Sequence, residues 1–211
     1  MSTRSSRVRR VVVLGLAGTL VGVRPGEVSA VPARKECRPT AFVANRDSGT
    51  VSTIDVKTRT KNPSDIPVGP LLVGVAVTPN SKTAFVANRD SNSVSTIDVK
   101  TRTKNPTDIA VGTHPTEVAV TPDGKTAFVT NALDDSVSTI DVKTRTKNPT
   151  DIPVGSIPTW VAFTPDGKTA FVSNNGSGTV STIDVKTGTK NPTDIAVGSL
   201  PFGVAITPCR R

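Results

Sequence analysis

Histidine, cysteine and aromatic residues are scarce in this chain of 211 residues. It contains one His, two Cys, one Trp, six Phe and no Tyr. So few His and Cys residues do not supply the Cys/His clusters that hold zinc, so we expect no metal site and no cofactor. No serine lies in the strand-turn-helix context of a nucleophile elbow, and no catalytic constellation emerges. The core must consist of Val, Ile, Ala and a few Phe, which suit β-strands.

Long apolar runs are also lacking, apart from one near the N-terminus. Residues 11–23 are apolar in the main, follow Arg9 and Arg10, and precede the small residues that end at Ala30. This order is typical of a bacterial-type signal peptide, and the run is shorter than the roughly 20 residues that cross a bilayer. We therefore expect cleavage of residues 1–30 near Ala30, with no stable membrane span afterwards. An uncleaved anchor is the alternative, and both Sec and twin-arginine export remain open.

Export places the protein outside the cell, on its surface or in the periplasm. Loss of the arginine-rich leader would lower the formal net charge from +9 to about +5. The mature chain is then mildly basic, which does not indicate a dedicated binder of polyanions.

After residues 31–39, which form a short segment containing Cys37, the chain consists of repeats. Four frames of 43 residues follow one another without insertion or deletion: 40–82, 83–125, 126–168 and 169–211. A period of this size indicates a solenoid or a propeller. Each frame has four short β-rich runs, in the third frame 126–131, 136–142, 151–154 and 159–163. Four strands per repeat predict an all-β propeller of four blades, each a four-stranded antiparallel sheet.

Turn residues support this division of each frame. Thr121-Pro-Asp-Gly124 has Pro, Asp and Gly in the order of a tight type I turn. Pro106 and its counterparts cannot donate to a ladder, so we expect them on the outer edge of a blade. The repeated Asp98 recurs identically in every frame, which favours a structural role in hydrogen bonding over a calcium or acid-base role.

One run in the third frame, Thr126-Ala-Phe-Val-Thr-Asn131 followed by Val137-Ser-Thr-Ile-Asp-Val142, resembles the repeat of the YVTN-family β-propellers. The resemblance covers residues 40–211, although Phe128 replaces the usual Tyr. Family members commonly have about seven blades, within the range known for propellers, whereas this chain has four repeats. The resemblance implies an exported or cell-surface protein and adds no mechanism.

The phase of the repeats suggests how a ring would close. The first frame begins with the second strand of a blade, and the chain ends on an innermost-type strand, residues 203–206. We predict that this last strand pairs beside residues 40–45, so that the N- and C-terminal strands share one blade.

The two cysteines, Cys37 and Cys209, are four whole periods apart and would meet at the same hairpin of a closed ring. In an exported protein this predicts a disulfide between them. Two free thiols are one alternative. A bond between two half-rings, which would make an eight-bladed dimer instead of a monomer, is the other.

Differences between the four copies gather in loops that the strand order places on one face. Because loops on a rigid scaffold commonly carry binding, we expect any site there. Trp160 either anchors a ligand or fills space between blades, and His114 is expected to be an exposed loop residue. The predicted binding face consists of Arg46, Leu71, Leu72, Arg89, His114, Asp134, Trp160 and Phe202.

The opposite face is predicted to carry a ring of cations. Such a ring could bind single-stranded nucleic acid or an anionic envelope, but no aromatic residues are interleaved for base stacking. A solvated, aggregation-resistant edge is therefore favoured. We call the following residues the basic rim: Lys57, Arg59, Lys61, Lys100, Arg102, Lys104, Lys143, Arg145, Lys147, Lys186 and Lys190.

Taken together, these patterns predict an exported, non-catalytic binding or scaffold module that acts on a protein or envelope component. Two alternatives stay open. One is a propeller enzyme, lyase or quinoprotein-like, which rests on fold analogy. The other is an electrostatic binder of single-stranded nucleic acid.

Overall fold

The computed structural model describes residues 39–208, which lie within a compact unit of residues 38–211. The predicted signal peptide, its cleavage site, Cys37 and Cys209 lie outside the described residues. All regular elements of the described part are β-strands, 19 in number. In this part no helix is long and apolar enough to cross a membrane.

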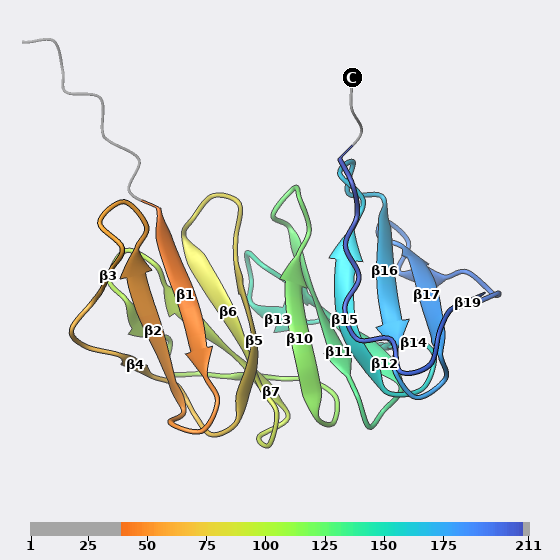
Figure 1. Cartoon of the computed structure of the whole chain (residues 1–211), viewed down its shortest axis with the longest axis horizontal. Coiled ribbons are helices and arrows are strands. Elements are labelled where there is room, and N and C mark those ends of the chain that lie inside the picture. Colours follow the sequence, from red (N-terminus) through yellow and green to blue (C-terminus); the bar gives the residue numbers. More distant parts are fainter. Residues whose placement is uncertain (1–38, 209–211) are drawn as a thin grey trace, which may run out of the picture. The chain divides into compact units, whose positions relative to one another are not determined.

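The strands form four antiparallel sheets that stand side by side (Figure 1). The first sheet contains β1 (Thr40–Asn45), β2 (Thr50–Asp55), β3 (Thr60–Lys61) and β4 (Ile66–Pro67). The second contains β5 (Leu72–Val77), β6 (Thr83–Asn88), β7 (Ser93–Asp98), β8 (Thr103–Lys104) and β9 (Ile109–Ala110). The third contains β10 (Pro115–Val120), β11 (Thr126–Asn131), β12 (Ser136–Asp141), β13 (Thr146–Lys147) and β14 (Ile152–Pro153). The fourth contains β15 (Pro158–Phe163), β16 (Thr169–Asn174), β17 (Thr179–Asp184), β18 (Thr189–Lys190) and β19 (Ile195–Ala196).

Each outer strand is divided into two short pieces, which corrects the expectation of four strands per blade. In the second sheet both β8 and β9 pair with β7. Between them Pro106 has no N–H to donate, and the Asn105 side chain instead donates to Thr96 Oγ1 at 2.7 Å. The prolines therefore lie at the outer edge, as predicted, but they interrupt the strand there.

The cores lie between neighbouring sheets. Phe85, Val118 and Ile140 belong to a cluster between the second and third sheets. Phe128 and Val161 belong to a cluster between the third and fourth, where the Phe128 and Phe163 rings meet edge to face at 5.2 Å. Sheets that pack face to face in sequence order, each twisted relative to the next, are the blades of a β-propeller.

The predicted pairing of the C-terminal segment with β1 does not form in this structure. β1 pairs with β2 alone among the described residues, so the first sheet lacks an innermost strand. Residues 201–208 form no strand and follow β15 at the other end of the row (Figure 1). Thr159 Oγ1 and Ser173 Oγ donate to the Phe202 carbonyl oxygen at 3.0 and 2.7 Å. These bonds hold the segment against the fourth sheet, on the side away from β1.

Candidate functional site

The innermost strands β5, β10 and β15 share one repeat position at which the residue type changes from strand to strand. It is occupied by Gly74, Glu117 and Trp160, and by Gly203 in the C-terminal segment. A shift in register lies at this position or next to it, between Pro115 and Glu117 and between Pro158 and Trp160. Bulges of this kind redirect a side chain and are common near functional sites. This row of positions is the candidate site.

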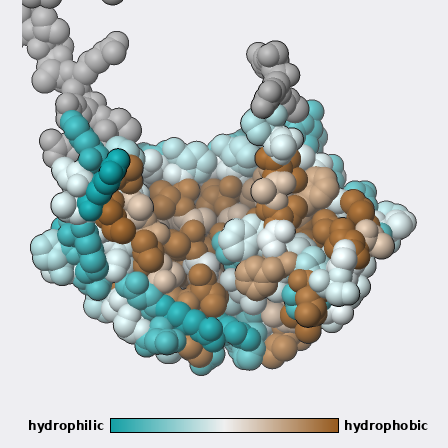
Figure 2. All heavy atoms as spheres, in the orientation of Figure 1, coloured by the Kyte–Doolittle hydropathy of each residue, from teal (hydrophilic) through white to brown (hydrophobic). Residues whose placement is uncertain are grey.

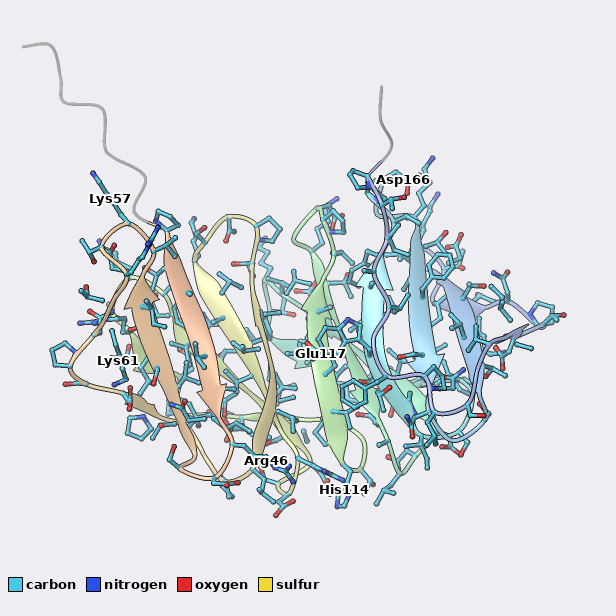
Figure 3. The ribbon with its side chains drawn as sticks, viewed as in Figure 1. Arg46, Lys57, Lys61, His114, Glu117 and Asp166 are labelled. Carbon is cyan, nitrogen blue, oxygen red and sulfur yellow. The ribbon has the colours of Figure 1, made fainter. Side chains whose placement is uncertain are left out.

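Glu117 is the only glutamate of the described residues. Figure 3 shows it midway along β10, away from Arg46 and His114 at one rim and from Lys57 at the other. Its backbone N–H donates to Thr130 Oγ1 at 3.1 Å, which fixes the strand at the bulge. Burial raises the pKa of its carboxyl to about 7, although a hydrogen bond from the Val118 backbone opposes the shift. A carboxyl that titrates near neutrality can both take up and release a proton.

The neighbouring strands leave different surroundings on the two sides of Glu117. On β5, a Cβ added to Gly74 would lie 2.8 Å from the Val118 nitrogen and 2.9 Å from the Glu117 Cα. Only glycine allows β5 and β10 to approach so closely. On β15, Trp160 is 36% exposed, and its ring lies 6.4 Å from that of Phe202. One side of Glu117 is therefore bare backbone, and on the other side the next inner strand carries Trp160, whose ring meets that of Phe202 from the C-terminal segment.

Most residues of the predicted binding face lie at one rim. Figure 3 shows Arg46 and His114 there. The Asn92 side chain accepts a hydrogen bond from the His114 backbone at 2.9 Å, and Asp134 accepts one from Thr113 at 2.6 Å. The polar side chains of this rim thus stabilise the loops between blades.

The other predicted members of that face are divided between surface and core. Trp160 and Phe202 are exposed, and Arg89 and Leu71 are half-buried. Leu72 is only 1% exposed and packs in the core between the first two sheets. Its place in the predicted binding face is a correction: it begins an innermost strand and points into the packing between blades.

The basic rim is partly neutralised by carboxylates. The last lysine of each repeated segment forms an ion pair with an aspartate four residues later, at N–O distances of 2.6 to 2.7 Å. The four pairs are Lys61–Asp65, Lys104–Asp108, Lys147–Asp151 and Lys190–Asp194. Because these lysines are paired with carboxylates, the basic rim fits the predicted solvated edge better than a ring of unpaired cations.

The repeated aspartates are part of turns. Asp141 Oδ1 accepts hydrogen bonds from the Thr144 backbone N–H at 2.7 Å and from Thr144 Oγ1 at 2.9 Å. These bonds lower the pKa of Asp141, and equivalent bonds lower the pKa values of Asp98 and Asp184. The predicted structural role agrees with this geometry. Within residues 39–208 no group of three or more His, Cys, Asp or Glu side chains could hold a metal ion.

Comparisons with known proteins support a propeller and connect it to enzymes. A family model described as Lactonase, 7-bladed beta-propeller matches residues 98–199, a segment that contains Glu117. No curated protein matches the chain. Among solved structures, hydrazine synthase of Kuenenia stuttgartiensis is 28% identical, with a TM-score of 0.69 over 75% of this chain and 46% of that one.

Two further solved structures show the same fold. A functionally unknown protein from Desulfotomaculum acetoxidans is 14% identical, with a TM-score of 0.70 over 81% of this chain and 59% of that one. A putative 6-phosphogluconolactonase from Bacteroides uniformis is 16% identical, with a TM-score of 0.69 over 80% of this chain and 58% of that one. The chain spans about half the length of these structures. It is a β-propeller.

The match to the lactonase model, together with the 28% identity to hydrazine synthase, corrects the expectation of a non-catalytic scaffold and points to an enzymatic propeller. The search for His, Cys and Ser constellations missed Glu117. One signal was available in the sequence: Glu117 is the only glutamate in the four repeats, and the other copies have Gly or Trp at its position.

Proposed function

We propose that this propeller is a hydrolase that opens lactone rings, with Glu117 as the general base. The observation that carries the proposal is the position of Glu117. Its carboxyl lies on an innermost strand, in the segment that the lactonase model covers, with a pKa raised to about 7 by burial. A base is most effective when its pKa is close to the working pH.

The reaction requires one proton acceptor and one water molecule. The Glu117 carboxylate takes a proton from water as the water oxygen attacks the lactone carbonyl carbon. The ring C–O bond then breaks, and the protonated Glu117 returns a proton to the departing alkoxide oxygen. The product is an open-chain hydroxy acid, and the carboxyl ends in its starting state.

The aromatic pair Trp160 and Phe202 would form an apolar wall for the ring of the substrate. Trp160 lies on the next inner strand, β15, at the position equivalent to Glu117, and Phe202 lies beside it in the C-terminal segment. On the opposite side β5 carries no side chain at Gly74, and its backbone packs directly against β10. This arrangement suits a small ring better than an extended polymer.

The test measures hydrolysis of a panel of γ- and δ-lactones, including phosphorylated sugar lactones. Proton release is the signal that reports each reaction. We expect the purified full chain to hydrolyse at least one of them, with a rate that rises as pH increases through about 7. Glu117→Gln should lower kcat by about 10²- to 10⁴-fold, the usual contribution of a general base.

The matched control is Asp141→Asn, which changes a turn carboxylate hydrogen-bonded to Thr144 and should leave kcat unchanged. An unaltered rate in Glu117→Gln would exclude the proposed base. Failure of the wild-type chain on the whole panel would exclude lactone hydrolysis.

The location and the finer family are also proposals. We propose that the repeats are of the YVTN type and that the chain acts outside the cell, on its surface or in the periplasm, because residues 1–30 have the composition of a signal peptide. A disulfide of Cys37 with Cys209, within one chain or between two half-rings, belongs to the same proposal. N-terminal sequencing and non-reducing mass spectrometry of the exported protein test these points.

A further inference from the structure

Two open sheet edges end the row of four blades. At one end, β1 has β2 on one side and no strand on the other among residues 39–208. At the other end, residues 201–208 occupy the place of an innermost strand without a second strand beside them. An open edge presents unpaired backbone N–H and C=O groups, which readily pair with another chain.

The C-terminal segment is already positioned as the innermost strand of a further blade. Thr116 Oγ1 on β10 donates to the Pro158 carbonyl oxygen of the next inner strand, at 2.9 Å. One repeat later, Thr159 Oγ1 on β15 donates to the carbonyl oxygens of Pro201 and Phe202, at 3.4 and 3.0 Å. The segment is therefore bound like its internal counterpart, and among residues 39–208 no second strand lies beside it.

The first sheet has the sequence and register of a partner for this segment. Inside the molecule, β5 pairs with β6 in a register that places Val75, Ala76 and Val77 opposite Val86, Phe85 and Ala84. The same repeat positions on the two open edges are Val204, Ala205 and Ile206 on one side and Val43, Phe42 and Ala41 on the other. The two edges are thus complementary in residue type and register.

Apolar surface accompanies the open edge at β1. Val43 is 41% exposed, whereas its counterpart Val86 is fully buried. Figure 2 shows an apolar area over the part of the surface where β1, β5 and β10 lie. Apolar surface of this kind next to an unpaired strand marks an interface.

We propose that a second copy of this chain covers both edges. Residues 203–206 of each copy pair beside β1 of the other, and the two junctions are identical, as a closed two-fold ring requires. The occupant is a second copy and not the same chain, because the two edges lie at opposite ends of the row (Figure 1). In addition, the row superposes on solved propellers of which it spans only 46 to 59%.

The paired copies form a ring of eight sheets around one channel. Both copies of Glu117 then lie on innermost strands of the same ring. The pairing does not depend on lactone hydrolysis, and its test does not use activity.

The first measurement is the mass of the purified full chain by sedimentation velocity. We expect twice the mass of one chain, and the mass of one chain would overturn the proposal. Val43→Lys places a charge on the open edge and should halve the measured mass. Val56→Lys is the matched control: Val56 is 48% exposed just beyond the end of β2 and is not part of β1, so the mass of this variant should stay doubled.

A cross-link tests the register and separates the two kinds of closure. In a Cys37→Ser/Cys209→Ser background, Val43→Cys with Val204→Cys should give a covalent dimer on mild oxidation, because disulfides require adjacent Cβ atoms. A disulfide within one chain would show that the ring closes alone and would overturn the proposal. Reversible urea unfolding of each variant confirms that a halved mass reflects lost pairing and not lost folding.

Discussion

The strands β1 and β6 have the same sequence, Thr-Ala-Phe-Val-Ala-Asn, and different surroundings. Every residue of β6 is buried, whereas no residue of β1 is. Both pair in the same register with the strand that follows. The difference comes with the strand on the other side: β5 pairs with the second edge of β6, whereas no described strand pairs with that edge of β1. Identical local sequence therefore produces identical pairing but not identical burial.

The largest expected difference in stability between β1 and β6 is at their shared phenylalanine position. Phe85→Ala should lower the free energy of unfolding by about 3 to 5 kcal/mol, because Phe85 is fully buried between two sheets. Phe42→Ala should cost less, about 1 to 2 kcal/mol in the single chain, because Phe42 is only partly buried. Urea unfolding measures both. Equal losses at low protein concentration would show that β1 is as well covered as β6.

Burial also separates Glu117 from the exposed aspartates, which gives a pH-dependent test. The pKa of Glu117 is raised from 4.5 to about 7, so the folded state binds more protons than the unfolded state in that window. The free energy of unfolding should therefore fall as pH rises from 4.5 to 7. Above pH 7 the total loss should be at most about 3 kcal/mol. Glu117→Gln should remove this fall.

The aspartates act in a different pH range and with the opposite sign. The pKa values of Asp98, Asp141 and Asp184 are lowered from 3.8, so their contribution is present above that value and disappears below it. Urea unfolding at several pH values separates the two windows. A wild-type curve that is flat between pH 4.5 and 7 would contradict the burial of Glu117.

A smaller effect concerns the asparagine that ends each of the two strands. Asn88 donates to Ser93 Oγ and Ser95 Oγ at 3.1 and 2.8 Å, and Asn45 makes the equivalent bonds in the first sheet. Asn88→Ala should cost about 1 to 3 kcal/mol because it leaves buried hydroxyls without a donor. Asn45→Ala should cost less than half of that, since Asn45 and its partner Thr50 are only half-buried. Chemical denaturation of both variants checks the ratio.

The smallest effect should be the same in both sheets, because it is local. Arg59 and Arg102 have φ angles of 59° and 57°, and the fourth repeat has Gly188 at this position with a φ of 66°. Arg59→Gly and Arg102→Gly should each raise the free energy of unfolding by about 0.5 to 1 kcal/mol, since glycine adopts this conformation without steric cost. Thermal unfolding that shows unequal gains would mean that neighbouring sheets influence the turn.

The sequence predicted the architecture well and the candidate site poorly. Repeats of constant length, period-two runs and turn residues such as Pro122 and Asp123 are local signals, and they placed strands and hairpins correctly. The candidate site depends on Glu117, the only glutamate of the four repeats. Its raised pKa comes from burial. Its raised pKa required the packing of an inner strand against its neighbours, which the spacing of residues does not contain.

The sequence by itself determined the four repeats, their strands and the tight turns, because each depends on residues within a few positions of one another. Only the tertiary structure decided that β1 is open while β6 is buried, that the C-terminal segment lies beside β15, and that Glu117 is surrounded by packed inner strands. These features depend on which sheet stands next to which. The four copies are nearly identical in sequence, so no local pattern within a copy shows which sheet is its neighbour.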